Sequence, residues 1–171
     1  MPVYKSVNKK FFKTWTPDMA YVLGFFAADG TITVTKRGGQ YWSIQITDKE
    51  LIEGIRSVIE STHAISVRQM RVNEQPLYRL QIGSREMCED LRALGFSERK
   101  AKSMGLPLVP EEYLADFIRG YFDGDGNVWV GKNNTQRVSS VNTILSVFTS
   151  SSIGFLLGLQ ECLRMRGLGG G

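Results

Sequence analysis

The sequence contains two related stretches, Tyr21-Val-Leu-Gly-Phe-Phe-Ala-Ala-Asp-Gly30 and Phe117-Ile-Arg-Gly-Tyr-Phe-Asp-Gly-Asp-Gly126. Each is an apolar run that places small residues four apart and ends in Asp-Gly just before a strand-like segment, which predicts a helix that leads into a strand. Asp29 and Asp125 are 125 − 29 = 96 positions apart. The chain therefore repeats one structural unit.

The composition limits the classes of protein to which this chain can belong. With 171 residues, 42% hydrophobic and 22% charged, we expect a soluble protein of one or two small domains. No apolar run reaches the roughly 18 residues of a membrane span, and no secretory signal is evident, so we expect no membrane partner and a cytoplasmic or organelle-matrix location. The net charge of +4 favours a polyanionic partner, and the single histidine excludes a multi-histidine zinc site.

The first repeat unit follows a basic arm, residues 1–15, which is either a frayed tail anchored by aromatic residues or an arm that lies along phosphates. Thr16-Pro17 predicts the start of the first helix. The alternating segments 31–35 and 41–46 predict a hairpin, and the pattern then gives helix, hairpin and helix. Residues 16–96 therefore form one αββαββα unit, with further strands expected near 65–72 and 77–82 and a last helix from Ser84.

The second unit follows a basic and proline-containing linker, residues 97–110, and covers residues 111–171. Pro110 is predicted to open its first helix. A hairpin over 127–132 and 142–149 and a helix from about Ser150 follow, with apolar positions that match the first unit at a constant offset of 155 − 51 = 104. The second hairpin and last helix have no counterpart. We therefore expect an open sheet edge, an uncovered core and a chain that is a fragment.

The outward face of the first hairpin is polar but almost uncharged. Hydroxyl and amide groups of this kind read base edges in the major groove, although threonine also favours strands for other reasons. Lys36 and Arg37 in the turn are expected to contact phosphates. The expected DNA contacts on the strands are Thr31, Thr33, Thr35, Tyr41, Ser43, Gln45, Arg68, Arg79, Gln81, Asn127, Trp129 and Lys132.

Small residues line one face of each repeated helix, with Gly24 in the first and Gly120 and Gly124 in the second. Such spacing lets two helix backbones approach closely; the alternative is that each helix packs only on its own sheet. Asp29 and Asp125 then stand at helix C-termini, where a carboxylate costs roughly 0.3–1 kcal/mol. One Asp-Gly pair is an ordinary turn, but two in the same register suggest that divalent cations offset both penalties.

Both stretches resemble the motif of the LAGLIDADG homing endonucleases. The segment 22–30 fits the nine-residue pattern except that Ala27 replaces the first acid, and the segment 118–126 fits with Asp123 present. The resemblance covers about residues 16–171, with the second half incomplete. It implies an α+β fold of two pseudo-symmetric αββαββα halves that pack through the motif helices, with antiparallel sheets that form a saddle in the DNA major groove.

The resemblance also implies a site-specific endonuclease that hydrolyses phosphodiester bonds of double-stranded DNA with Mg²⁺, or with Ca²⁺ or Mn²⁺ in its place. Asp29 and Asp125 would bind the metal with the backbone carbonyls of Ala28 and Gly124. Two further catalytic positions follow from the family pattern. The central lysine would be Lys100, with Lys102 as its rival, and the polar residue near the end of the second strand would be Gln45 rather than Asp48.

A different class remains open, namely a non-cleaving nucleic-acid binder on the same fold, such as an intron RNA maturase or a transcription factor. The presence of both acids favours the enzyme. Intron-encoded or free-standing origin is expected, because nothing resembles the splicing ends of an intein. We expect a monomer when complete, with the missing C-terminal segment supplied in some cases by a separate chain.

Overall fold

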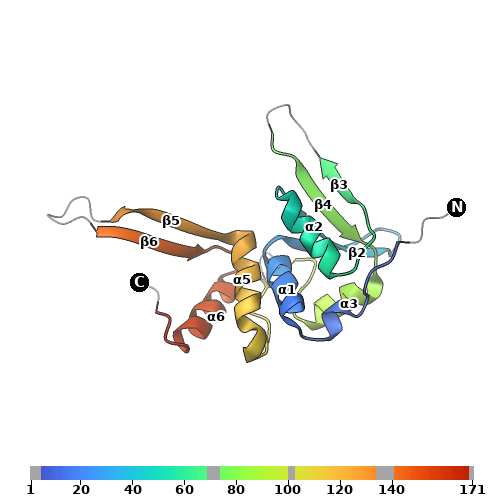
Figure 1. Ribbon diagram of the computed structural model, residues 1–171. Coiled ribbons are helices and arrows are strands. Elements are labelled where there is room, and N and C mark those ends of the chain that lie inside the picture. Colours follow the sequence, from blue (N-terminus) through green and yellow to red (C-terminus); the bar gives the residue numbers. More distant parts are fainter. Residues whose placement is uncertain (1–4, 69–73, 100–102, 134–140, 170–171) are drawn as a thin grey trace.

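The computed structural model describes residues 5–68, 74–99, 103–133 and 141–169 (Figure 1). None of the described helices has both the length and the apolar character needed to cross a bilayer. The elements, in chain order, are η1 (Phe11–Lys13), α1 (Pro17–Asp29), β1 (Gly30–Val34), β2 (Gln40–Ile46), α2 (Lys49–Val58), β3 (Ile65–Arg68), β4 (Leu77–Ile82), α3 (Arg85–Ala93), η2 (Glu111–Tyr113), α5 (Leu114–Asp125), β5 (Gly126–Asn133), β6 (Val141–Phe148) and α6 (Ile153–Arg164).

The helices of the first unit begin where the sequence predicts. Thr16 Oγ1 accepts a hydrogen bond from the Met19 amide at 3.0 Å, which caps α1. Asp48 and Ser84 cap α2 and α3 in the same way. The strands form one antiparallel sheet in the order β1-β2-β4-β3. The expected strand over 65–72 is described only through residue 68, and its remainder lies outside the described residues.

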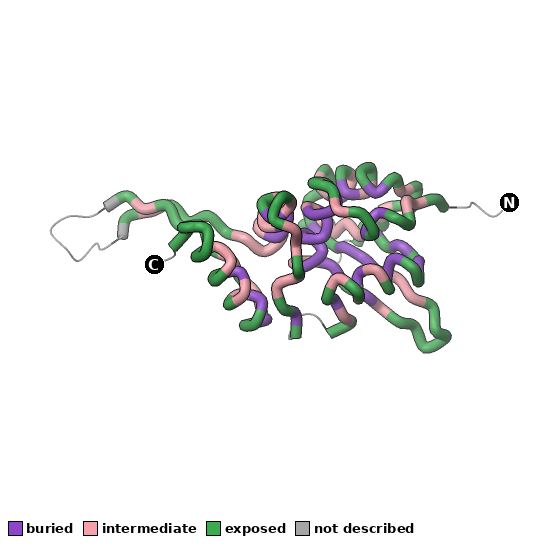
Figure 2. Tube along the Cα trace, turned by 90° about the horizontal axis from the view of Figure 1, so that it is seen from below, coloured by how far each residue is buried: buried purple, intermediate pink, exposed green. Residues whose placement is uncertain are grey.

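The two faces of this sheet differ as the alternation predicts. The inner face packs against α1: Trp42 is fully buried, and its ring centroid lies 6.1 Å from that of Phe26. Figure 2 shows the buried residues concentrated in the first unit and along α1 and α5. The inner face consists of Ile32, Trp42, Ile44, Leu80 and Ile82. The outer face consists of Thr31, Thr33, Tyr41, Ser43, Gln45, Arg79 and Gln81.

The described part of the arm packs on the first unit. The Asn8 amide donates to the Ile59 carbonyl at 3.1 Å, just after α2. Lys13 pairs with Glu86 and Asp90 on α3 at 3.2 and 3.0 Å. Residues 5–15 are therefore tied down rather than frayed, and the expected aromatic anchoring is present because Phe11 and Phe12 are buried in the core. Contact of this arm with phosphates stays a prediction.

The two units meet along a seam between α1 and α5 (Figure 1). A Cβ atom on Gly24 would overlap the backbone carbonyl oxygen of Phe117, and a Cβ on Gly120 would overlap that of Tyr21. This reciprocal fit requires glycine at both positions, because either side chain would collide with backbone rather than with a flexible group. The predicted close approach of the two helices is confirmed, and packing of each helix only on its own sheet is wrong.

The second unit is more open. Pro110 opens the short turn η2 rather than α5 itself, which begins at Leu114. Among the described residues no strand pairs with the outer edge of β6, whereas β4 occupies the corresponding edge of β2. A groove of about 450 Å³ lies between β6 and α6. Its lining is mostly apolar: Ser146, Val147, Phe148, Ile153, Leu156, Leu157, Leu159, Gln160, Leu163 and Leu168.

Candidate active site

The two acids that end α1 and α5 lie at the same end of the seam. The helices run parallel, and a Cβ on Gly124 would lie 3.4 Å from Asp29 Oδ2. Burial raises the pKa of the Tyr121 phenol, and the negative charges of Asp125 and Asp29 raise it further. One phenol therefore senses both carboxylates, which the repeat predicts and a single motif would not.

A depression of about 330 Å³ opens beside Asp29, where α1, α5 and the end of β2 meet. Gln45 lies in it with an exposed side chain. Asp48 lines the same depression, but its Oδ1 accepts a hydrogen bond from the Leu51 amide at 3.0 Å and so caps α2. Gln45 is therefore the better candidate for contact with a substrate, and its catalytic role stays a prediction.

The donor groups around Asp29 suit a hard divalent cation. All the polar side chains that line the depression, which also include Asp123, offer oxygen atoms or an amide. Two helix C-termini point their negative dipole ends to this place, which a cation would neutralise. Within the described ranges, no three His, Cys, Asp or Glu side chains gather closely enough to hold a metal. A cation here would therefore take further ligands from phosphate or water.

One contact across the seam breaks the symmetry of the two halves. The Tyr21 hydroxyl donates to Asp123 Oδ2 at 2.8 Å. Burial and this hydrogen bond raise the pKa of the Tyr21 phenol. At the offset of 96, the counterparts of these two residues are Phe117 and Ala27, which have no polar side-chain atoms. The sequence shows the missing acid at position 27, but it does not show that Asp123 has a partner 102 residues away.

Thr149 is a site residue that sequence reasoning missed. Gly30 pairs with Ile44 as Gly126 pairs with Phe148, so the second strands of the two hairpins correspond at an offset of 148 − 44 = 104. Thr149 is thus the counterpart of Gln45. Its hydroxyl donates to the Asp125 carbonyl at 2.7 Å. Applying the offset of 104 to Gln45 would have found it.

The residues predicted to contact DNA from the outer face of the first sheet differ in their exposure to solvent. Gln45, Thr31 and Gln81 are exposed, and the Arg79 guanidinium lies 5.7 Å from the centre of the Tyr41 ring. Thr33 is partly exposed.

Ser43 requires a correction. Its side chain is only 3% exposed, because it lies between Thr31 and Gln81 on the neighbouring strands and bonds the Thr31 hydroxyl at 3.0 Å. It does not present the open hydroxyl that a direct DNA contact requires.

The turn between β1 and β2 displays two basic residues. The Thr35 hydroxyl accepts a hydrogen bond from the Gly39 amide at 2.9 Å, and Gly38 has a φ of 81°, which glycine adopts readily. Thr35 therefore closes the turn with its hydroxyl. The turn exposes Lys36 and Arg37 to solvent.

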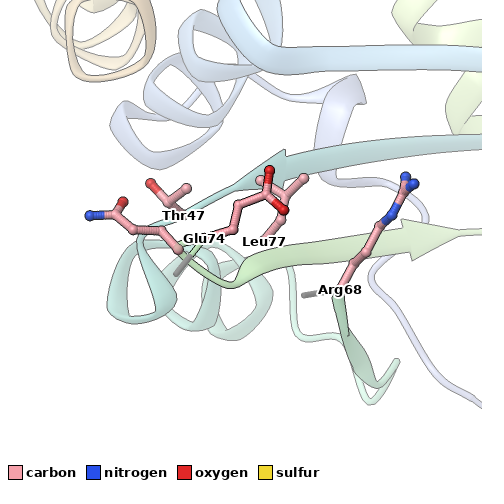
Figure 3. A pocket seen from close by; sticks show the side chains of 5 residues that line it. Thr47, Arg68, Glu74 and Leu77 are labelled. Atoms are coloured by element: carbon pink, nitrogen blue, oxygen red, sulfur yellow. The ribbon is translucent and has the colours of Figure 1, made fainter. Parts of the chain in front are cut away.

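A second depression, of about 240 Å³, lies beside the first where β3 ends and β4 begins, and the two share Thr47 and Leu77 (Figure 3). Arg68 pairs with Leu77 in the sheet. Figure 3 shows the Arg68 guanidinium and the Glu74 carboxylate rising from the same side of the ribbon as Thr47. Arg68 is therefore exposed on the outer face of the sheet, and Glu74 lines the same depression.

The second hairpin divides its predicted DNA contacts between two faces. Strand β5 alternates regularly, so Asn127 and Trp129 share one face while Lys132 lies on the face of Val128 and Val130. Lys132 is five positions from Asn127 and three from Trp129, and both offsets are odd. Its contact with DNA stays a prediction. Lys100 and its rival Lys102 lie outside the described residues.

Comparison with known proteins identifies a family across most of the chain. The family model described as the LAGLIDADG-like domain matches residues 16–94 and 112–169. An uncharacterized protein of Methanocaldococcus jannaschii is 26% identical over 140 residues, which are 75% of this chain and 48% of that protein. A component of the A-type ATP synthase of Methanopyrus kandleri is 27% identical over 115 residues, 67% of this chain and 11% of that protein. The chain thus spans half or less of the curated relatives it matches.

Solved structures share the fold. The LAGLIDADG meganuclease I-AabMI bound to uncleaved DNA has a TM-score of 0.54 at 16% identity, with 89% of this chain and 72% of that chain covered. The meganuclease I-SmaMI bound to uncleaveable DNA has a TM-score of 0.53 at 15% identity, with 90% and 72% covered. The predicted α+β fold, with its two related units joined through the motif helices, is confirmed.

Proposed function

We propose that this chain, which belongs to the LAGLIDADG family, binds double-stranded DNA and hydrolyses it at a specific site with the help of a divalent cation. The observation that carries the proposal is the meeting of Asp29 and Asp125 at the C-terminal ends of two helices packed at backbone distance. A carboxylate at the negative end of a helix carries an electrostatic cost, and a cation held by both acids would offset it. The meganucleases of the same fold are bound to DNA in their structures.

DNA binding would use the outer face of the first sheet. Lys36 and Arg37 in the exposed turn would contact phosphates, which give affinity that falls with salt. Gln45 and Gln81 would supply amide donors and acceptors to base edges, and Thr31 a hydroxyl. Phosphate contacts would set the register and base contacts the sequence preference.

Hydrolysis would take place over the ends of α1 and α5. Asp29 and Asp125 would hold the cation, Mg²⁺ in our proposal, with the carbonyls of Ala28 and Gly124. Such a cation lowers the pKa of bound water and neutralises charge on the phosphate. Gln45 would hold the attacking water by hydrogen bonds, and Lys100 would stabilise the negative charge that builds up on the phosphate.

The proposal is tested with duplexes recovered by binding from a randomised library in EDTA, where cleavage is off. Addition of Mg²⁺ is expected to cut the recovered duplexes at one position, and EDTA is expected to stop the reaction. Binding without cleavage in Mg²⁺, Mn²⁺ or Ca²⁺ would overturn the nuclease and favour the non-cleaving binder. Preference for intron RNA over every duplex would point to a maturase.

A further inference from the structure

The outer faces of the two hairpins carry different chemistry at corresponding positions. The pair Trp129 and Leu145 on β5 and β6 corresponds to the pair Thr33 and Tyr41 on β1 and β2. The next pair, Asn127 and Val147, corresponds to Thr31 and Ser43 in the same way. At three of these four positions a hydroxyl-bearing side chain of the first hairpin is replaced by an apolar one in the second, while Asn127 keeps a polar group.

We define the exposed apolar platform as Trp129 and Leu145, which are 44% and 45% exposed. Val147 lies on the same face and is 40% exposed, but it also lines the groove beside α6. A Cβ on Gly131 would overlap the six-membered ring of Trp129, so the indole lies along the strand over this glycine. The corresponding residue of the first hairpin is Thr35. The glycine thus makes room for a flat aromatic surface.

The platform is not an unfinished part of the core. The core of the second unit lies on the other face of the hairpin, where the Phe148 ring packs against Phe122 with centroids 5.3 Å apart. A strand added to the free edge of β6 would extend the sheet without covering Trp129 and Leu145. In the first unit their counterparts Thr33 and Tyr41 stay partly exposed although β4 pairs with β2, whereas Ser43, the counterpart of Val147, is buried beside Gln81 of β4.

The platform continues the face that we propose binds DNA, so its ligand should lie on the same duplex. The methyl group of thymine is the apolar group at the base edges of the major groove, and apolar side chains contact it. We propose that the platform reads thymine methyl groups. The half-site under the second unit is then selected by apolar contact, and the half-site under the first by hydrogen bonds. This inference rests on the proposed DNA binding.

The test replaces each thymine of a selected duplex, one at a time, by deoxyuridine, which removes the methyl group and keeps every hydrogen bond. Affinity is measured in EDTA, so cleavage plays no part. We expect a loss of about fourfold at two or three positions within one half-site, the scale of burying one methylene-sized group. Leu145→Gln is expected to abolish this sensitivity at the positions that Leu145 contacts, because it replaces the apolar end of the side chain by an amide and carries no methyl group.

Thr33→Ala is the matched control on the first hairpin, and it should leave the deoxyuridine effect intact. Circular dichroism and thermal unfolding verify that both variants fold; Trp129→Gln provides a second variant should Leu145→Gln fail to fold. Equal affinity for thymine and deoxyuridine at every position, or an unchanged deoxyuridine effect in whichever of Leu145→Gln and Trp129→Gln folds, would overturn the methyl readout while DNA binding stands. Failure to recover any duplex from the library would instead overturn the proposed function.

Discussion

The elements that the two units share follow the same order, but the core of the first unit is covered more completely than that of the second. Ile59 at the end of α2 is fully buried, whereas its counterpart Leu163 on α6 is partly exposed beside the apolar groove. Both lie at the same position in the repeat, 163 − 59 = 104 residues apart. The sequence pattern determines which way each side chain points, and neighbouring elements decide how deeply it is buried.

The seam between the units is, by contrast, nearly symmetric. Gly24 and Gly120 each lie against a backbone carbonyl of the facing helix. We therefore expect matched substitutions on the two sides of the seam to lower stability by similar amounts. Matched substitutions in the sheets and outer helices of the two units should lower it by different amounts.

The largest effect on stability is expected at the seam. Gly24→Val would force a side chain into the Phe117 carbonyl, and Gly120→Val would do the same at Tyr21. Each is expected to lower the free energy of unfolding in urea by about 3 kcal/mol or to prevent folding. Gly54→Ala on the exposed face of α2, where a Cβ meets nothing within 4 Å, is the control and should raise stability slightly. A mild effect at Gly24 with a severe one at Gly120 would break the symmetry of the seam.

Matched substitutions at corresponding positions near the ends of α2 and α6 are expected to lower the free energy of unfolding by different amounts. Ile59→Ala removes a fully buried side chain and is expected to cost about 3 kcal/mol. Leu163→Ala removes a partly exposed one, and the expected cost is about 1 kcal/mol. Both are measured by chemical denaturation. Equal costs would mean that the groove beside α6 is covered in solution.

A smaller effect should come from the polar contact across the seam. Tyr21→Phe removes the hydroxyl that donates to Asp123, with an expected cost of about 1 kcal/mol. A double-mutant cycle with Asp123→Ala measures the coupling between the two side chains. Additive costs would show that this contact, and the asymmetry it creates, contributes nothing to stability.

The sequence correctly predicted the features that depend on residues close together along the chain. The caps at Thr16, Asp48 and Ser84 follow from helix-start chemistry, and the closely packed seam follows from small residues four apart. The meeting of Asp29 with the end of α5 followed from the repeat. These inferences needed only local pattern and one internal symmetry.

Other features depend on residues that are distant in the chain. Ser43 lies on the predicted face, but Gln81 and Thr31 cover it, and no local pattern shows that. The partner of Tyr21 lies on the other motif helix. Lys132 lies on the opposite face of β5 from Asn127 and Trp129. Side-chain accessibility in a sheet is set by neighbouring strands, so it requires the pairing register.

The most direct test of the central claim measures cleavage of a selected duplex in Mg²⁺ by Asp29→Asn and Asp125→Asn. Asp18→Asn, at the opposite end of α1, is the matched control. We expect each site variant to bind DNA in EDTA as the wild type does and to cut it at least about 100-fold more slowly, while the control is unchanged. Cleavage by either site variant at the wild-type rate would contradict the assignment of the two acids.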